Sequence, residues 1–260
     1  IAFESLVKLI ALLAVGVFAV YQGFGSLDLM EQWVREQPEL LRRIKEPAAP
    51  GTFQIMVLVF FSAAVATPQM FYMTFHENNH PRALSVASWG LPLYFLLLSL
   101  PVLPILWAGL RSGALTPMEY YPVTLGAHYN SELFTLIGFV GGMSAASGLI
   151  IVITLALSTM CLNHLILPVW QPSARQDIYR WLLWKRRALI AALIWGGFLF
   201  YYIPDNQQSI RAISNTGLIG SLQFLPAIVA LLYWPRGNKK GFMAGLAAGP
   251  AIWFVFLVLP

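Results

Sequence analysis

Residues 133–163 form a run of 31 residues that contains no Asp, Glu, Lys, Arg or His. A helix of that length more than crosses the hydrocarbon layer of a bilayer, which is about 30 Å thick and needs about 20 apolar residues. Small polar residues interrupt the run near its middle, at residues 141–148. Serine and glycine at mid-depth are costly in lipid unless they face other helices, a cavity or a ligand. The run therefore predicts a membrane-spanning helix with a functional segment at its centre.

The composition also indicates a membrane protein. Of 260 residues, 58% are hydrophobic and 10% are charged, whereas soluble domains carry about 25% charged residues. Too little polar surface remains to cover a water-soluble globule of this size. We interpret the net charge of +5 as a topology signal, and we expect lipid rather than nucleic acid around the chain. The single cysteine, Cys161, excludes an intramolecular disulfide and a cysteine-rich metal site.

Hydropathy predicts one domain over residues 1–260, an all-α polytopic membrane protein with about seven transmembrane helices. The predicted spans are residues 5–22, 53–75, 84–110, 133–169, 184–203, 212–234 and 242–259. Basic residues are densest at residues 175–187, so the positive-inside rule predicts that this loop is cytoplasmic. Because the chain starts without Met and stops in an apolar run, we expect a piece of a longer bacterial inner-membrane protein.

Prolines and short periodic segments add local expectations. Five prolines fall within predicted spans, where each removes a backbone donor and is expected to kink or interrupt the helix: Pro68, Pro92, Pro101, Pro104 and Pro226. Broken helices near the midplane are how many transporters expose backbone groups to substrate and ion. In the loop at residues 24–51, apolar residues stand at helical spacing, and Pro38 is expected to divide the segment in two.

His76-Glu77-Asn78-Asn79-His80 matches the H-E-x-x-H motif. In metalloproteases this spacing places two histidines around zinc, and the glutamate activates water. An intramembrane zinc protease is therefore a remote alternative from a different functional class. The two asparagines and the Pro81 that follows favour a turn over a helix, and no third ligand follows in the expected pattern. We therefore expect no metal, no cofactor and no catalytic residue here.

Several sequence blocks stand in an order that is typical of a known family. They are Thr67-Pro68-Gln69, Glu77-Asn78, Pro81-Arg82, the segment 142–148, Leu157 to Met160 with Asn163, Gln223 to Pro226, Tyr233-Trp234, Arg236-Gly237-Asn238 and the glycines Gly241, Gly245 and Gly249. The arrangement resembles the sodium:solute symporter family. The likeness is greatest to the transporter-like input module of CbrA-type sensor histidine kinases.

This resemblance implies the LeuT-like inverted-repeat core, which has two five-helix halves around a central site. The first predicted span would be the fifth core helix, the next five the second repeat, and the seventh an accessory helix. The first four core helices of the same protein would then be missing from this chain. Substrate contacts would fall on the middle of the second span, at Ser62, Ala63, Ala64, Ala66 and Thr67. This group would face the fourth span, with ion contacts at Gly141, Ser144 and Ser147. Hydrogen bonding to the backbone of their own helix is the alternative for Ser62 and Thr67.

The implied function is membrane transport of a small solute, an amino acid, with histidine suggested by the resemblance alone. The implied coupling ion is Na⁺ or H⁺. Sodium-coupled members present two adjacent hydroxyl residues, whereas here Ala145 follows Ser144, so we expect weak or absent sodium binding and uncoupled or proton-linked transport. The alternative function is a non-transporting input module that reports solute to a cytoplasmic kinase domain.

Overall fold

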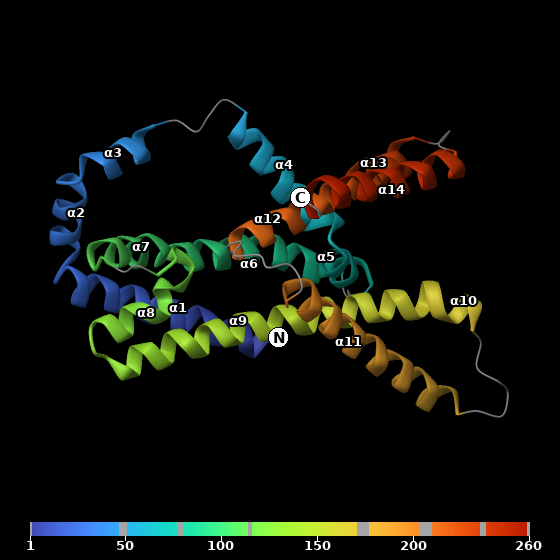
Figure 1. The fold of residues 1–260 in the computed structure, drawn as a ribbon, viewed down its shortest axis with the longest axis horizontal. Helices are drawn as coiled ribbons and strands as arrows, with labels where there is room; N and C mark the ends of the chain where they lie inside the picture. The colour runs from blue at the N-terminus through green and yellow to red at the C-terminus, as the bar shows by residue number, and fades with distance from the viewer. Residues whose placement is uncertain are drawn as a thin grey trace. The chain divides into compact units, whose positions relative to one another are not determined.

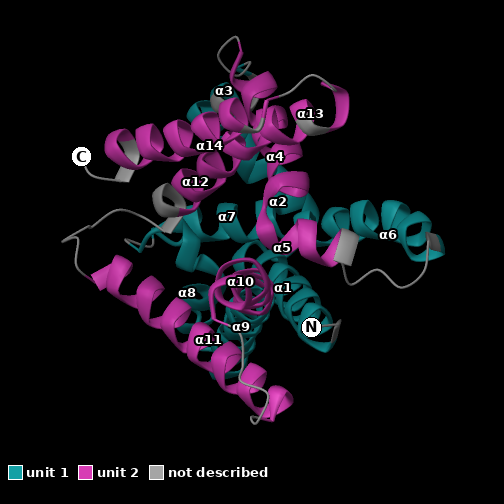
Figure 2. Cartoon of the chain, turned by 90° about the vertical axis from the view of Figure 1, so that its right-hand side faces the viewer, with its two compact units in different colours: residues 1–47, 79–152 teal, residues 48–78, 153–260 magenta. Residues whose placement is uncertain are grey.

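The computed structural model describes residues 2–46, 51–76, 81–113, 116–170, 177–202, 210–234 and 238–258. Within these ranges every regular element is a helix and no strand occurs, which confirms the all-α prediction (Figure 1). The chain divides into two compact units, residues 1–47 with 79–152 and residues 48–78 with 153–260 (Figure 2).

In its described residues the first unit contains seven α-helices in whole or part: α1 (Ala2–Gly23), α2 (Leu27–Arg35), α3 (Pro38–Lys45), α6 (Pro81–Ser99), α7 (Val102–Arg111), α8 (Tyr121–His128) and most of α9 (Glu132–Cys161). A 3-10 turn, η2 (Met118–Tyr120), precedes α8. Pro38 occupies the first turn of α3, as predicted. Pro101 separates α6 from α7, whereas α6 continues through Pro92.

The core of the first unit lies where α1, α7 and α8 meet. Its buried side chains are Val15, Ala19, Phe24, Ile105, Ala108, Tyr121 and Leu125. Helix α2 packs on the end of this core, and the ring centroids of Trp33 and Phe24 lie 5.5 Å apart. Ser26 caps α2 by accepting a hydrogen bond from the Leu29 amide at 3.2 Å. Residues 27–35 are therefore a helix anchored to this unit.

The described residues of the second unit are also helical, and part of them form a packed group. Its elements are α4 (Thr52–Ala66), α5 (Pro68–Phe71), η1 (Tyr72–His76), the end of α9, η3 (Leu162–Ile166), α10 (Leu167–Val169), α11 (Ile178–Tyr202), α12 (Ile210–Ser221), η4 (Leu222–Phe224), α13 (Leu225–Tyr233), α14 (Lys239–Trp253) and η5 (Phe254–Val258). Helix α4 packs against α12 and α13, and α14 packs against η4 and α13. The Trp253 indole Nε1 donates to the Thr216 carbonyl at 3.1 Å, which ties α14 to α12.

Three helical segments of the described chain are long and apolar enough to cross a membrane: Phe3–Gly23, Arg82–Arg111 and Glu132–Val169. A fourth results if Thr52–Ala66 and Pro68–Thr74, bent by 51°, count as one span. The structure thus has three to four of the seven predicted spans by this criterion. Helix α11 carries Lys185, Arg186 and Arg187 in its first half, which shortens its apolar part. Large apolar side chains on α6 are exposed, among them Trp89 at 83%.

Candidate functional site

Helix α1 lies along α9 (Figure 1), and polar side chains of the two helices meet near the start of α1. The two helices run antiparallel, because contacts that ascend along α1 descend along α9: Glu4 with Ser144, Ala11 with Gly141, and Phe18 with Phe134. A Cβ on Gly141 would stand 2.6 Å from the Ala11 Cβ. Glycine at this position lets the two helices approach closely.

Glu4 presents both a main-chain oxygen and its carboxylate to α9. Ser144 Oγ donates to the Glu4 main-chain oxygen at 2.9 Å, and Ser147 Oγ donates to Glu4 Oε1 at 3.3 Å. Ser147 Oγ also lies 3.2 Å from the Ser144 main-chain oxygen. The second carboxylate oxygen, Glu4 Oε2, is buried. The structure therefore brings two predicted ion-binding serines together around a carboxylate.

Helix α6 adds an aromatic hydroxyl to the same region, and α1 itself adds a cation. Tyr94 Oη donates to the Ser5 main-chain oxygen at 2.9 Å. The Lys8 Nζ lies 5.6 Å from the centroid of the Tyr94 ring, a cation–π arrangement. Lys8 follows Glu4 by four residues, so both lie on one face of α1. The cluster thus combines one acid, one base and three hydroxyl groups.

The cluster lies inside two of the candidate spans and at the start of a third. Tyr94 follows Arg82, the start of its span, by 12 residues, or about 18 Å along a helix. Ser144 follows Glu132, the start of the α9 span, by 12 residues as well, again about 18 Å. Helices α6 and α9 run in opposite directions beside α1. The distance to Tyr94 is therefore measured from one end of the unit, and the distance to Ser144 from the other end. Glu4 itself is the second residue of the candidate span Phe3–Gly23, so it lies at the end of that span while it contacts inner residues of the α9 span.

This arrangement can hold a proton or a small cation. Carboxylate, hydroxyl and main-chain oxygens are the ligands that hard cations prefer, and a carboxylate is also a proton acceptor. Gly141, the third predicted ion-binding residue, lies inside the unbroken helix α9. Its observed contribution is the close packing against Ala11.

The predicted substrate residues line the last turns of α4 in the second unit. Ser62, Ala63 and Ala66 are buried, whereas Ala64 is exposed and Thr67 is half-buried. Thr67 Oγ1 donates to the Ala63 main-chain oxygen at 2.6 Å, so its hydroxyl bonds to its own helix. Ser62 Oγ is fully buried and has no hydrogen-bond partner among the described residues.

Helix α4 ends where the sequence predicts a break. Thr67 has an extended backbone, with ψ at 136°, and Pro68 begins α5. A cavity of about 230 Å³ opens beside this break. Its lining is apolar and comes from four regions of the second unit: Ala66 with Pro68 and Phe71, Met160, Phe224 with Ala227 and Ile228, and Phe242 with Leu246. One predicted substrate residue, Ala66, therefore borders an observed cavity.

The predicted substrate and ion residues belong to different units of the chain. The structure joins Ser144 and Ser147 with Glu4 in the first unit, and it groups Ser62, Ala63 and Ala66 on the buried side of α4 in the second. The predicted facing of these two groups stays a prediction.

The H-E-x-x-H segment falls at a boundary of the described chain. His76 ends the π-helical turn η1, and Glu77 to His80 lie outside the described residues. Elsewhere in the part that the structure describes, no three His, Cys, Asp or Glu side chains converge as metal ligands.

Sequence reasoning missed Glu4, Lys8 and Tyr94. The first span was predicted to begin at Ser5, which placed Glu4 just outside it, yet the helix begins at Ala2. An acidic residue at the edge of an apolar run was the available signal, since ionisable residues inside membranes are usually functional.

Comparisons with known protein families, with characterised proteins and with solved structures find no match to this chain.

Proposed function

We propose that this chain is part of a membrane carrier for a small solute, of the sodium:solute symporter type, and that Glu4 is its proton-binding group. The observation that carries the proposal is the Glu4 carboxylate 3.3 Å from Ser147 Oγ, inside the candidate span that begins at Glu132. A carboxylate at this depth is costly to retain, so it is more readily explained by a proton or cation pathway than by stability.

The hydrogen bonds suggest how a proton would act. An ionised Glu4 only accepts hydrogen bonds, whereas a protonated Glu4 also donates one. When Glu4 is protonated, its carboxyl group can donate a hydrogen bond to Ser147 Oγ instead of accepting one. The Ser147 hydroxyl can then donate to its second acceptor, the Ser144 main-chain oxygen. Proton binding at Glu4 would thus rearrange the contact between α1 and α9.

The broken helix α4–α5 supports a solute site. The 51° bend and the neighbouring cavity of about 230 Å³ provide an interrupted helix next to an apolar space. Ser62 and Ala66, one helical turn apart, would lie beside the solute. We propose an amino acid as the solute, and histidine on the strength of the family resemblance alone.

The finer architecture is part of the same proposal. It comprises seven spans in a bacterial inner membrane, arranged as the fifth core helix, the second five-helix repeat and one accessory helix of a LeuT-like core. The missing partners would be the first four core helices of the same protein.

Solute uptake by the complete protein in proteoliposomes tests the proposal. Glu4→Gln keeps the size and hydrogen-bonding reach of the side chain but cannot exchange a proton. We expect this variant to lose uptake driven by a pH gradient and to keep solute exchange at equal pH. Glu31→Gln is the matched control, because Glu31 pairs with Arg35 on the surface of α2.

Two outcomes would contradict parts of the proposal. Gradient-driven uptake that is unchanged in Glu4→Gln would exclude Glu4 as the proton-binding group. Solute binding without any uptake in the unaltered protein would instead favour the solute-sensing input module of a histidine kinase.

A further inference from the structure

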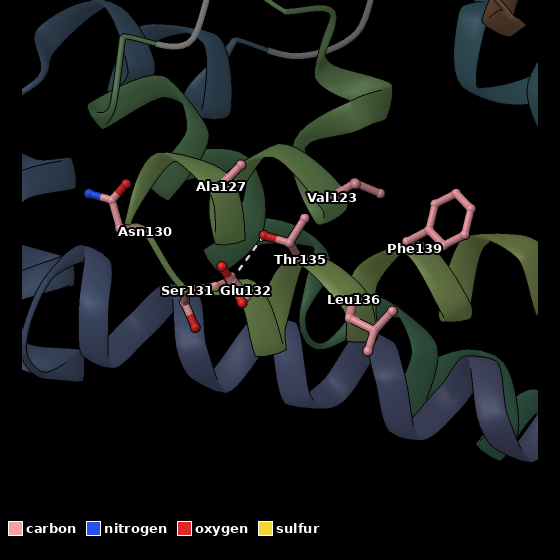
Figure 3. A pocket seen from close by; sticks show the side chains of 8 residues that line it. All are labelled: Val123, Ala127, Asn130, Ser131, Glu132, Thr135, Leu136 and Phe139. Atoms are coloured by element: carbon pink, nitrogen blue, oxygen red, sulfur yellow. Dashed lines mark hydrogen bonds between the residues drawn. The ribbon is translucent and has the colours of Figure 1, made fainter.

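An open groove of about 560 Å³ lies between α8 and the start of α9, within the first unit (Figure 3). A tight turn joins the two helices. Asn130 has a left-handed backbone with φ at 52°, and the Ser131 amide donates to the Gly126 carbonyl at 2.8 Å. Thr135 Oγ1 then donates to the Ser131 main-chain oxygen at 2.9 Å. These bonds fix the polar end of the groove.

The groove is polar at one end and apolar at the other. Asn130, Ser131 and Glu132 line the polar end, and Leu136 and Phe139 line the apolar end (Figure 3). Leu136 and Phe139 follow Glu132 by four and seven residues, so all three lie on one face of α9. Leu136 is 59% exposed and Phe139 is 53% exposed. The apolar end therefore faces the surroundings of the helix.

This polarity matches the layers of a membrane. Glu132 is the first residue of the candidate span Glu132–Val169. At 1.5 Å per residue, Leu136 lies about 6 Å deeper and Phe139 about 10 Å deeper. The headgroup layer on each side of a bilayer is about 5 to 8 Å thick. A lipid headgroup would thus lie beside Glu132, and its acyl chain beside Phe139.

The polar end carries a negative charge. Glu132 is exposed and forms no ion pair with any described basic side chain. Its carboxylate, the Asn130 amide oxygen and the Ser131 hydroxyl are all hydrogen-bond acceptors. A primary ammonium group, with three donors and one positive charge, complements the Glu132 carboxylate.

We propose that this groove binds a phospholipid with a primary-amine headgroup, of the phosphatidylethanolamine class. The ammonium would bind Glu132, and an acyl chain would lie along Leu136 and Phe139. A soluble amine would satisfy the polar end and leave the apolar end uncovered, which is why we assign a lipid.

Native mass spectrometry of the chain tests this proposal with equimolar phosphatidylethanolamine and phosphatidylglycerol. We expect the amine lipid to be retained about tenfold more, the ratio that one charge-assisted hydrogen bond can supply. Glu132→Gln should bring the ratio close to one, and Glu132→Asp should restore most of it. Glu119→Gln is the matched control, because Glu119 is exposed in η2 and does not line the groove. Phe139→Ala should weaken both lipids alike.

N-acetylated phosphatidylethanolamine makes the test independent of variant folding. It keeps the shape of the lipid but lacks the cation, so the unaltered chain should retain it no better than phosphatidylglycerol. Equal retention of amine and glycerol lipids, or an unchanged preference in a folded Glu132→Gln, would overturn the proposal. Displacement of the lipid by equimolar glycerophosphoethanolamine would also overturn it, because that result indicates a site for soluble amines.

Discussion

Replacing Gly141 by alanine should loosen the packing of α1 on α9. The new methyl group would stand 2.6 Å from the Ala11 Cβ, whereas carbon atoms in contact lie about 3.5–4.0 Å apart. The helices must therefore separate by about 1 Å, and overpacking of this kind costs about 1–3 kcal/mol. Alanine also recovers about 1 kcal/mol of helix propensity relative to glycine. The expected net loss in free energy of unfolding is about 0–2 kcal/mol.

The neighbouring glycine provides a matched control. No described atom outside its own helical turn lies within 4 Å of a Cβ built on Gly142. Gly142→Ala should therefore show only the propensity gain of about 1 kcal/mol. The two alanine variants should differ by about 1–3 kcal/mol, which is the clash alone. Adding Ala11→Gly to Gly141→Ala removes the opposing methyl group and should recover part of this difference.

Denaturant unfolding in detergent micelles, followed by far-UV circular dichroism, measures these differences. The coupling between residues 11 and 141 follows from the double-mutant cycle. Equal stability of the Gly141→Ala and Gly142→Ala variants, together with zero coupling to Ala11→Gly, would refute the observed contact between α1 and α9. The position of Glu4 beside Ser144 would then lose its support as well.

The remaining predictions concern orientation, metal and coupling ion. In a Cys161→Ala background, a cysteine at Ser173 should resist a membrane-impermeant thiol reagent in intact cells while one at Gln37 reacts, because the densest basic cluster predicts a cytoplasmic loop; reversed labelling would contradict this orientation. The purified protein should carry no stoichiometric zinc and Glu77→Gln should leave solute binding nearly unchanged, whereas one zinc per chain by elemental analysis would revive the protease alternative. In uptake assays on the complete protein, replacing sodium by choline should have little effect and Ala145→Ser should increase sodium dependence, since a second adjacent hydroxyl adds an oxygen ligand; a strong sodium requirement in the unaltered protein would count against proton coupling.

Local sequence rules predicted several elements correctly. The charge-free run became one continuous helix, α9, from Glu132 to Cys161. Helix α4 ends before Pro68, and α3 begins at Pro38, because proline lacks a backbone donor and fits the first turn of a helix. These features depend on residues within about one turn of each other, so the sequence alone was sufficient to determine them.

The same rules failed where neighbouring helices decide the outcome. Pro92 and Pro101 both lie in the third predicted span, yet only Pro101 falls at a break between helices. Pro101 packs against Gly16 of α1, whereas α6 accommodates Pro92 within its length. The intrinsic effect of proline is the same at both positions, and the packing around it differs.

The polar cluster also depended on tertiary structure. Helix α9 is apolar on all sides, so its residue pattern does not mark the face that meets another helix. Ser144 and Ser147 could be singled out as polar residues at mid-depth, but their partner Glu4 lies 140 residues away from Ser144 in the chain. Composition and length determined that this segment is long and apolar enough to cross a membrane. Which side chains meet along it was decided only by the antiparallel packing of α1 on α9, where Gly141 leaves room for Ala11.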